Sequence, residues 1–158
     1  MKTPRILILA TLVIGLLLWP PPPSQAGDYT PEQAVDLARK GADLIEKVGV
    51  DEARKVLHDP QGGYLSENKE LYVLVMNFKG EWVIYPPFPA TEGKSALNVK
   101  DVDGKLLVQD MIKTARDKGE GWVKYRWVHP PTGKIRPKET YVVRVGDMDL
   151  FSAVGIYP

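Results

Sequence analysis

The fold is decided by a central stretch that reads Leu71-Tyr72-Val73-Leu74-Val75-Met76-Asn77-Phe78, then Lys79-Gly80, then Glu81-Trp82-Val83-Ile84-Tyr85. Both outer runs are rich in β-branched and aromatic residues, and the lysine–glycine pair between them suits a tight turn. Pro86 and Pro87 end the second run, because proline cannot donate to a strand ladder. The stretch therefore predicts a β-hairpin. Its first strand is apolar on both faces, so we expect one face to pack on a helix and the other to enclose something else.

The residues before the hairpin predict a long helix. Thr30 is a typical N-cap, Pro31 suits the first helical position, and Gln33 completes a capping box. Apolar residues then recur close to a 3.6-residue period, at Ala34, Leu37, Ala38, Ala42, Leu44, Ile45 and Val48. Gly49 predicts the end of this helix, and a second short helix is expected over residues 51–58.

The residues after the hairpin predict another helix and three more strands. The helix is expected to begin at Asp103 or Gly104 and to end near Lys118, and the strands are expected over residues 122–128, 138–145 and 150–157. In the first of these strands, alternation places Val123, Tyr125 and Trp127 on one face. The element order predicts an α+β domain, in which a long N-terminal helix packs on a five-stranded antiparallel sheet.

The N-terminus has the pattern of an export signal. Lys2 and Arg5 precede a short uncharged apolar run, and Ser24-Gln25-Ala26 supplies the small residues typical of a cleavage site. We therefore expect residues 1–26 to be a signal peptide and the protein to be periplasmic or secreted. The alternative is an uncleaved segment that anchors the protein in the inner membrane. Cleavage would leave residues 27–158 as one mature domain with no membrane span and no output module.

The composition excludes several classes of function. The 158 residues contain no cysteine, and 21 basic side chains nearly balance 20 acidic ones. There is thus no thiol chemistry and no electrostatic case for binding nucleic acid. The two histidines, His58 and His129, lack neighbours at metal-ligand spacing, and no catalytic or phosphate-binding motif is present. We expect a non-enzymatic protein without a metal or cofactor.

Aromatic and cationic residues alternate late in the chain. The aromatic members are Trp122, Tyr125, Trp127 and Tyr141, and the cationic members are Lys124, Arg126, Arg136, Lys138 and Arg144. For any single residue the simplest interpretation is an aromatic core beside a solvated face of cations. The alternative is a small-ligand pocket with aromatic walls and one cation that holds a small anion.

The same region resembles the single Cache domain, type 2, an extracytoplasmic sensing module of bacterial receptors. The matching residues are Gly121-Trp122-Val123-Lys124-Tyr125-Arg126-Trp127, then Pro130 with Gly133-Lys134, Pro137-Lys138 with Tyr141-Val142, and Val154-Gly155-Ile156-Tyr157. Asp103-Gly104-Lys105 before a helix fits as well, and the resemblance covers residues 31–157. It implies a PAS-like fold with a long N-terminal helix behind the sheet and a ligand cavity on the other face.

The resemblance also implies a function. Members of this family bind small organic molecules, often short carboxylates such as acetate, propionate or pyruvate. The motif lysine, here Lys138, is the expected anion partner, and Trp127, Tyr125 and Tyr141 are expected wall or donor positions. Tyr85 is added because it ends the hairpin. We therefore expect a sensor for a small organic acid that relays its bound state to a membrane partner, the alternative being an interaction domain whose pocket is filled.

A buried lysine needs a partner when no ligand is bound, because an unpaired buried charge is unfavourable. The acidic residues expected to serve Lys138 in this way are Glu139 and Asp110, with water as the other possibility.

Overall fold

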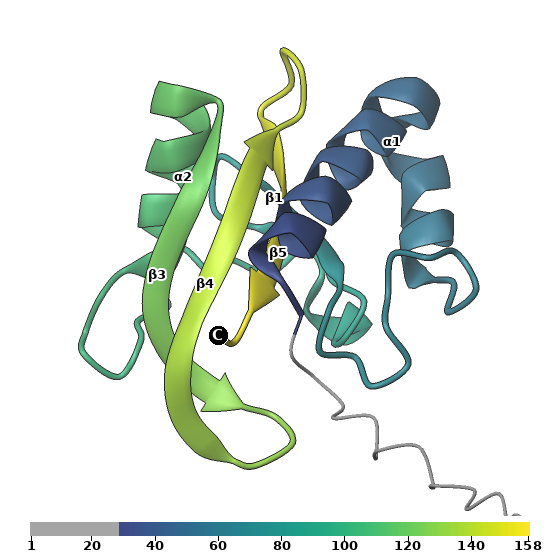
Figure 1. Ribbon diagram of the computed structural model, residues 1–158. Coiled ribbons are helices and arrows are strands. Elements are labelled where there is room, and N and C mark those ends of the chain that lie inside the picture. Colours follow the sequence, from purple (N-terminus) through teal and green to yellow (C-terminus); the bar gives the residue numbers. More distant parts are fainter. Residues whose placement is uncertain (1–28) are drawn as a thin grey trace, which may run out of the picture.

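The computed structural model describes residues 29–158, so the predicted signal peptide lies outside the described residues. Two α-helices and five strands follow one another within these described residues (Figure 1). They are α1 (Pro31–His58), β1 (Val73–Asn77), β2 (Trp82–Ile84), α2 (Leu107–Lys118), β3 (Glu120–His129), β4 (Lys134–Arg144) and β5 (Leu150–Ile156), with a short 3₁₀ turn, η1 (Pro89–Thr91), between β2 and α2.

The five strands form one antiparallel sheet in the order β2-β1-β5-β4-β3. Helix α1 packs across β1, β5 and β4, whereas α2 packs against β3 and β4 (Figure 1). The buried residues form one hydrophobic cluster that includes α1 and a second that includes α2, on opposite faces of the sheet. The predicted α+β class, the five-stranded antiparallel sheet and the long helix packed on it are confirmed.

The start and the break of α1 follow the sequence. The Thr30 hydroxyl accepts a hydrogen bond from the Gln33 amide at 3.3 Å, and the Gln33 side chain accepts one from the Thr30 amide at 2.8 Å. These two bonds are the predicted capping box. Gly49 has a φ of 78° and interrupts the helical backbone, so a kink separates the two helical pieces that the sequence predicts.

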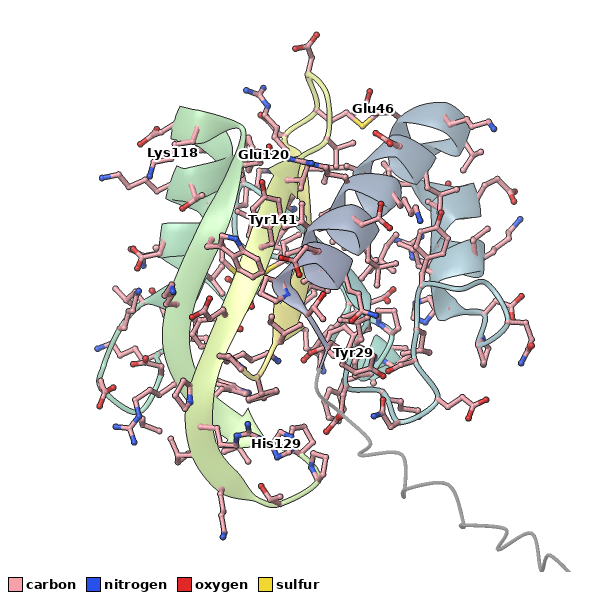
Figure 2. The ribbon with its side chains drawn as sticks, viewed as in Figure 1. Tyr29, Glu46, Lys118, Glu120, His129 and Tyr141 are labelled. Atoms are coloured by element: carbon pink, nitrogen blue, oxygen red, sulfur yellow. The ribbon has the colours of Figure 1, made fainter. Side chains whose placement is uncertain are left out.

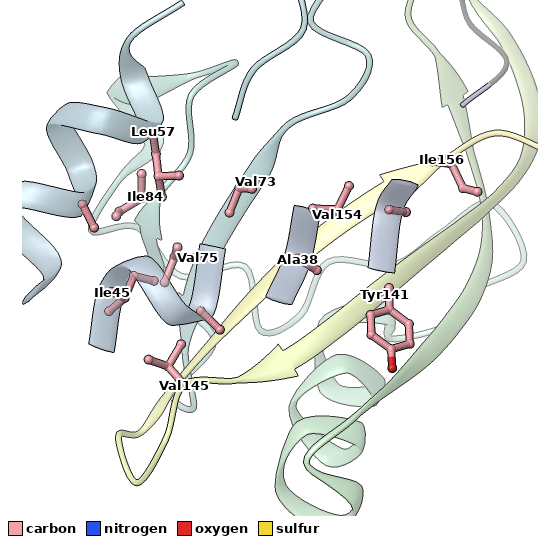
Figure 3. Close-up of a cluster of buried hydrophobic side chains, with 13 residues drawn as sticks. Ala38, Ile45, Leu57, Val73, Val75, Ile84, Tyr141, Val145, Val154 and Ile156 are labelled. Atoms are coloured by element: carbon pink, nitrogen blue, oxygen red, sulfur yellow. The ribbon is translucent and has the colours of Figure 1, made fainter. Parts of the chain in front are cut away.

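The predicted hairpin is also confirmed. Strand β1 pairs with β2, with Val75 opposite Ile84, and Gly80 in the connecting turn has a φ of 80°. Residues 73–76 are all buried, as expected of a strand with a hydrophobic layer on each face. Figure 3 shows Val73 and Val75 in the cluster on the α1 side, beside Val154 of β5.

Helix α2 begins later than predicted, at Leu107 and not at Asp103 or Gly104. The reason is a tight turn at residues 101–105. One carboxylate oxygen of Asp101 accepts hydrogen bonds from the amides of Asp103 and Lys105, both at 2.9 Å, and Gly104 has a φ of 83°. These local bonds compete with the helix, as is common for aspartate.

Within residues 29–158, neither helix has the length and apolar character needed to cross a membrane.

Candidate functional site

A small cavity lies between the sheet and α2. It is lined from the sheet by Leu74, Trp82, Tyr125, Trp127, Lys138, Thr140 and Gly155, from α2 by Leu107, Val108 and Met111, and from connecting segments by Tyr72, Tyr85 and Val99. Its volume is about 60 Å³. A cavity needs a volume of about 10–15 Å³ to hold a single water molecule. This cavity therefore admits only a ligand of a few non-hydrogen atoms. Most of its lining is apolar or aromatic, which is typical of small-molecule sites.

Lys138 is the charged residue of this cavity. It lies on β4 opposite Tyr125 of β3, and only 7% of its surface is exposed. Its ammonium nitrogen lies 4.7 Å from the centre of the Tyr157 ring and 5.7 Å from that of Tyr72. Among residues 29–158 it has neither an ion pair nor a hydrogen bond. Burial lowers the pKa of Lys138 to about 8, because the charged form loses its hydration.

The predicted acidic partners of Lys138 are wrong. Glu139 is paired with Lys124 at 2.8 Å, and Asp110 lies 3.3 Å from Lys105. Glu139 follows Lys138 directly in β4, and successive side chains of a strand point to opposite faces of the sheet. The ammonium group instead lies near the rings of Tyr72 and Tyr157. The negative faces of such rings attract a cation but do not neutralise its charge.

Hydroxyl groups complete the polar part of the cavity. The Tyr125 and Thr140 hydroxyls lie 2.8 Å apart, within hydrogen-bond distance. Burial holds the pKa of Tyr125 and of Tyr72 above the usual range, so both remain neutral donors at physiological pH. An anion in this cavity would thus meet one ammonium group and several neutral O–H donors.

The aromatic wall is held by stacking. The rings of Trp82 and Tyr85 lie 4.2 Å apart and nearly parallel, and the ring of Tyr125 meets that of Trp127 edge-on at 6.2 Å. Under the lysine, the Tyr157 hydroxyl donates to the carbonyl of Val128 at 2.7 Å, which fixes its ring. Aromatic pairs of this kind contribute about 0.5–1.5 kcal/mol beyond the area they bury.

The structure brings together four of the residues predicted from the sequence: Lys138, Trp127, Tyr125 and Tyr85 all line the cavity. Tyr141, which the sequence also predicts at the site, does not line this cavity. It lies three residues after Lys138 in β4, an odd spacing that turns its side chain to the α1 face. Figures 2 and 3 show it there, beside Glu120 and in the cluster with Val154.

Several lining residues were not predicted. Trp82, Thr140 and Gly155 belong to the sheet, Tyr72 directly precedes β1, and Leu107, Val108 and Met111 belong to α2. Strand periodicity could have found Thr140, since it lies two residues from Lys138 on the same face. No feature of the sequence indicates that α2 lines the cavity, because the apolar stripe of this helix predicts only that the stripe is buried. Among residues 29–158, no cluster of His, Cys, Asp or Glu side chains could hold a metal ion.

The protein has a long helix on one face of an antiparallel sheet and a small cavity, lined by Lys138 and Thr140, on the other face. This arrangement is typical of PAS-like sensor domains. The chain belongs to the family described as single Cache domain 2, whose model matches residues 24–158. The predicted family is therefore confirmed. Single Cache domains sense small molecules in chemoreceptors and sensor kinases, where they are extracytoplasmic.

Individual relatives agree with this assignment. The sensor histidine kinase MctS of Rhizobium johnstonii is 29% identical over 93 residues, which are 59% of this chain. The match covers 20% of that kinase, so the chain spans about a fifth of its curated relative. A Cache chemosensory domain solved in a study of carboxylic acid recognition shares the fold, with a TM-score of 0.65 and 20% identity, over 80% of this chain and 91% of that one.

A periplasmic sensor domain of a chemotaxis protein is similar as well. It has a TM-score of 0.60 and 26% identity, over 80% of this chain and 88% of that one.

Proposed function

We propose that this protein binds a small organic acid, a short carboxylate, through Lys138. The observation that carries the proposal is the buried ammonium group, which faces the cavity without an acidic partner in the described part of the chain. A charge buried in this way is unfavourable unless an opposite charge reaches it. A ligand carboxylate would supply that charge and make charge-assisted hydrogen bonds, which are about twice as strong as neutral ones.

The cavity also suggests the orientation of the ligand. Lys138 and Thr140 project from the sheet, whereas Leu107, Val108 and Met111 face them from α2. The carboxylate would therefore lie on the sheet, within reach of the Tyr125 hydroxyl, and a short apolar tail would lie under α2. A volume of about 60 Å³ favours an acid the size of acetate or propionate.

The cellular part of the proposal rests on the family and on the N-terminal sequence. Residues 1–26 would direct export and be removed, which leaves residues 27–158 as a periplasmic or secreted ligand-binding domain without catalytic activity. An uncleaved N-terminal anchor in the inner membrane is the alternative, and N-terminal sequencing of the exported protein separates the two. The bound state would pass to a membrane signalling partner, since the relatives are parts of a sensor kinase and a chemotaxis protein.

A thermal-shift screen of the full chain with acetate, propionate, pyruvate, lactate and small amines tests the proposal. The cognate ligand should stabilise the fold by about 2.7 kcal/mol at a hundredfold excess over its Kd. Lys138→Met should abolish the shift, whereas Lys134→Met, at an exposed position of the same strand, should leave it unchanged. If no compound raises the Tm, the alternative of a non-catalytic interaction domain with an unused pocket is favoured.

A further inference from the structure

Lys138 differs from every other lysine in residues 29–158. The others are exposed to solvent, whereas Lys138 is 7% exposed and projects into a cavity. Gly155 leaves room for the extended lysine side chain, because a Cβ at that position would come within 2.6 Å of Lys138 Cε. The primary amine is thus presented at a fixed place, in an apolar pocket that holds a molecule of a few atoms.

A buried amine without an acidic partner is a nucleophile as well as a charge. Lysines that form Schiff bases with carbonyl ligands are activated in this way, by desolvation in a hydrophobic pocket. We propose that the Lys138 amine condenses reversibly with the carbonyl carbon of a small aldehyde or 2-oxo acid bound in this cavity. The inference rests on the proposed small-ligand site and adds a second way in which a ligand can bind there, through a covalent bond to Lys138.

The chemical step balances without an oxidant or reductant. The Lys138 ammonium first releases a proton, and the neutral amine then forms a carbon–nitrogen bond to the carbonyl carbon. The π electrons move to the carbonyl oxygen, which takes up a proton while the nitrogen releases one, and the product is a neutral carbinolamine. Protonation and departure of that hydroxyl as water leaves the carbon–nitrogen double bond. In total, an ammonium and a carbonyl compound give a protonated imine and water, and the reverse reaction releases the ligand.

The surroundings of Lys138 favour each part of this step. At pH 7 a lysine whose pKa is about 8 is neutral in roughly one molecule in ten, against roughly one in three thousand for an ordinary lysine. The Tyr125 and Thr140 hydroxyls line the same cavity and can donate to the carbinolamine oxygen. The aromatic side chains of Trp82, Tyr85 and Trp127 line the cavity, and an aromatic lining would slow hydrolysis of the imine by bulk water.

Reductive trapping tests the inference. The full chain would be incubated at pH 7 with limiting pyruvate and sodium cyanoborohydride, and the modified lysines would be identified by peptide mass spectrometry. Lys138 should gain a carboxyethyl group at least about tenfold faster than exposed Lys134, because burial lowers the pKa of Lys138 and enlarges its neutral fraction. The Lys138→Arg variant should lose this fast adduct. Equal rates at the two lysines, or no adduct on Lys138, would overturn the inference.

A competition experiment on the unaltered protein avoids dependence on a variant that fails to fold. Acetate or propionate at a concentration that raises the Tm should slow trapping at Lys138 and leave trapping at Lys134 unchanged. A carboxylate that raises the Tm while Lys138 reacts no faster than Lys134 would overturn the inference and leave the proposed function standing. Fast trapping at Lys138 with no Tm response to any carboxylate would support the inference and contradict the proposed function.

Discussion

Gly155 of β5 lies directly against the Lys138 side chain of β4: a Cβ on Gly155 would come 2.6 Å from Lys138 Cε and 2.7 Å from the Thr140 hydroxyl oxygen. Real Cβ atoms essentially never approach other heavy atoms so closely, so even a methyl group would displace the lysine or the threonine. The bare backbone at this position is therefore part of the proposed binding site, although glycine has no side chain to contribute.

Gly155→Ala should accordingly abolish ligand binding. The added methyl group should also lower the free energy of unfolding by about 1–3 kcal/mol, the usual effect of overpacking. Isothermal titration with the cognate carboxylate and urea denaturation measure the two effects. Ser152→Ala is the control, because Ser152 lies on the α1 face of the same strand and its hydroxyl is buried without a hydrogen bond in the described structure. That variant should bind normally. Normal binding by Gly155→Ala would contradict the assignment of Lys138.

The hydroxyl of Tyr125 should contribute to affinity, whereas that of Tyr141 should not. Tyr125→Phe removes a donor beside Thr140 in the cavity and should weaken carboxylate binding by roughly tenfold, which corresponds to about 1.4 kcal/mol. Tyr141→Phe removes a hydroxyl on the opposite face of the sheet and should leave the Kd unchanged. The two variants exchange the same atoms, so the difference between their Kd values isolates the effect of position. Equal losses of affinity would contradict the proposed orientation of the ligand.

Ligand affinity should fall as the pH rises through about 8. In the proposed site the ammonium form of Lys138 would bind the carboxylate, and burial lowers the pKa of Lys138 to about 8. At pH 9 the Kd should be about tenfold higher than at pH 6, since most molecules must first take up a proton. Titrations between pH 6 and pH 10 check this. A Kd that stays constant to pH 9.5 would show that another group, or a neutral lysine, holds the ligand.

The stability of the empty protein should change with pH in the opposite direction. The unfolded chain keeps Lys138 charged up to its ordinary pKa of 10.5, whereas the folded chain releases the proton near pH 8. The unfolded state therefore binds more protons in this window, and the free energy of unfolding should rise with pH, by at most about 1.4 kcal/mol per unit. Denaturation at pH 7.5 and pH 9.5 measures the change. Lys138→Met should remove this increase, while Lys134→Met should retain it.

Much of the fold could be predicted from the sequence, because local patterns determine its elements. The capping box at Thr30, the turn at Gly80 and the alternation of Val123, Tyr125 and Trp127 each act over a few residues. The start of α2 could not be predicted, because it depends on which backbone amides donate hydrogen bonds to the Asp101 carboxylate. The site depends on packing across the sheet: Gly155 and Met111 reach the cavity from elements distant in sequence. The placement of Tyr141 on the other face of the sheet follows from strand parity, because it lies an odd number of residues after Lys138.

The last prediction concerns Glu92, which ties the aromatic wall of the cavity to the C-terminal part of α1. Its carboxylate accepts a hydrogen bond from the Tyr85 amide at 2.8 Å, lies 2.7 Å from His58 Nε2, and pairs with Arg54 at 3.2 Å. Glu92→Gln keeps the shape of the side chain but removes its charge, and so leaves Arg54 without this ion pair. We expect a loss of about 1–3 kcal/mol in the free energy of unfolding, because charged hydrogen bonds of a largely buried group are lost.

Because Tyr85 lines the cavity, Glu92→Gln should also raise the Kd of the carboxylate, although Glu92 does not itself line the cavity. Glu52→Gln is the matched control: Glu52 lies on the same part of α1 and pairs with Lys55 at 2.6 Å, but 61% of its side chain is exposed. Exposed pairs of this kind contribute about 0–1 kcal/mol, so this variant should unfold and bind almost normally. If Glu92→Gln lowers stability without changing the Kd, the position of Tyr85 does not depend on α1, and the helix is only a structural support for the sheet.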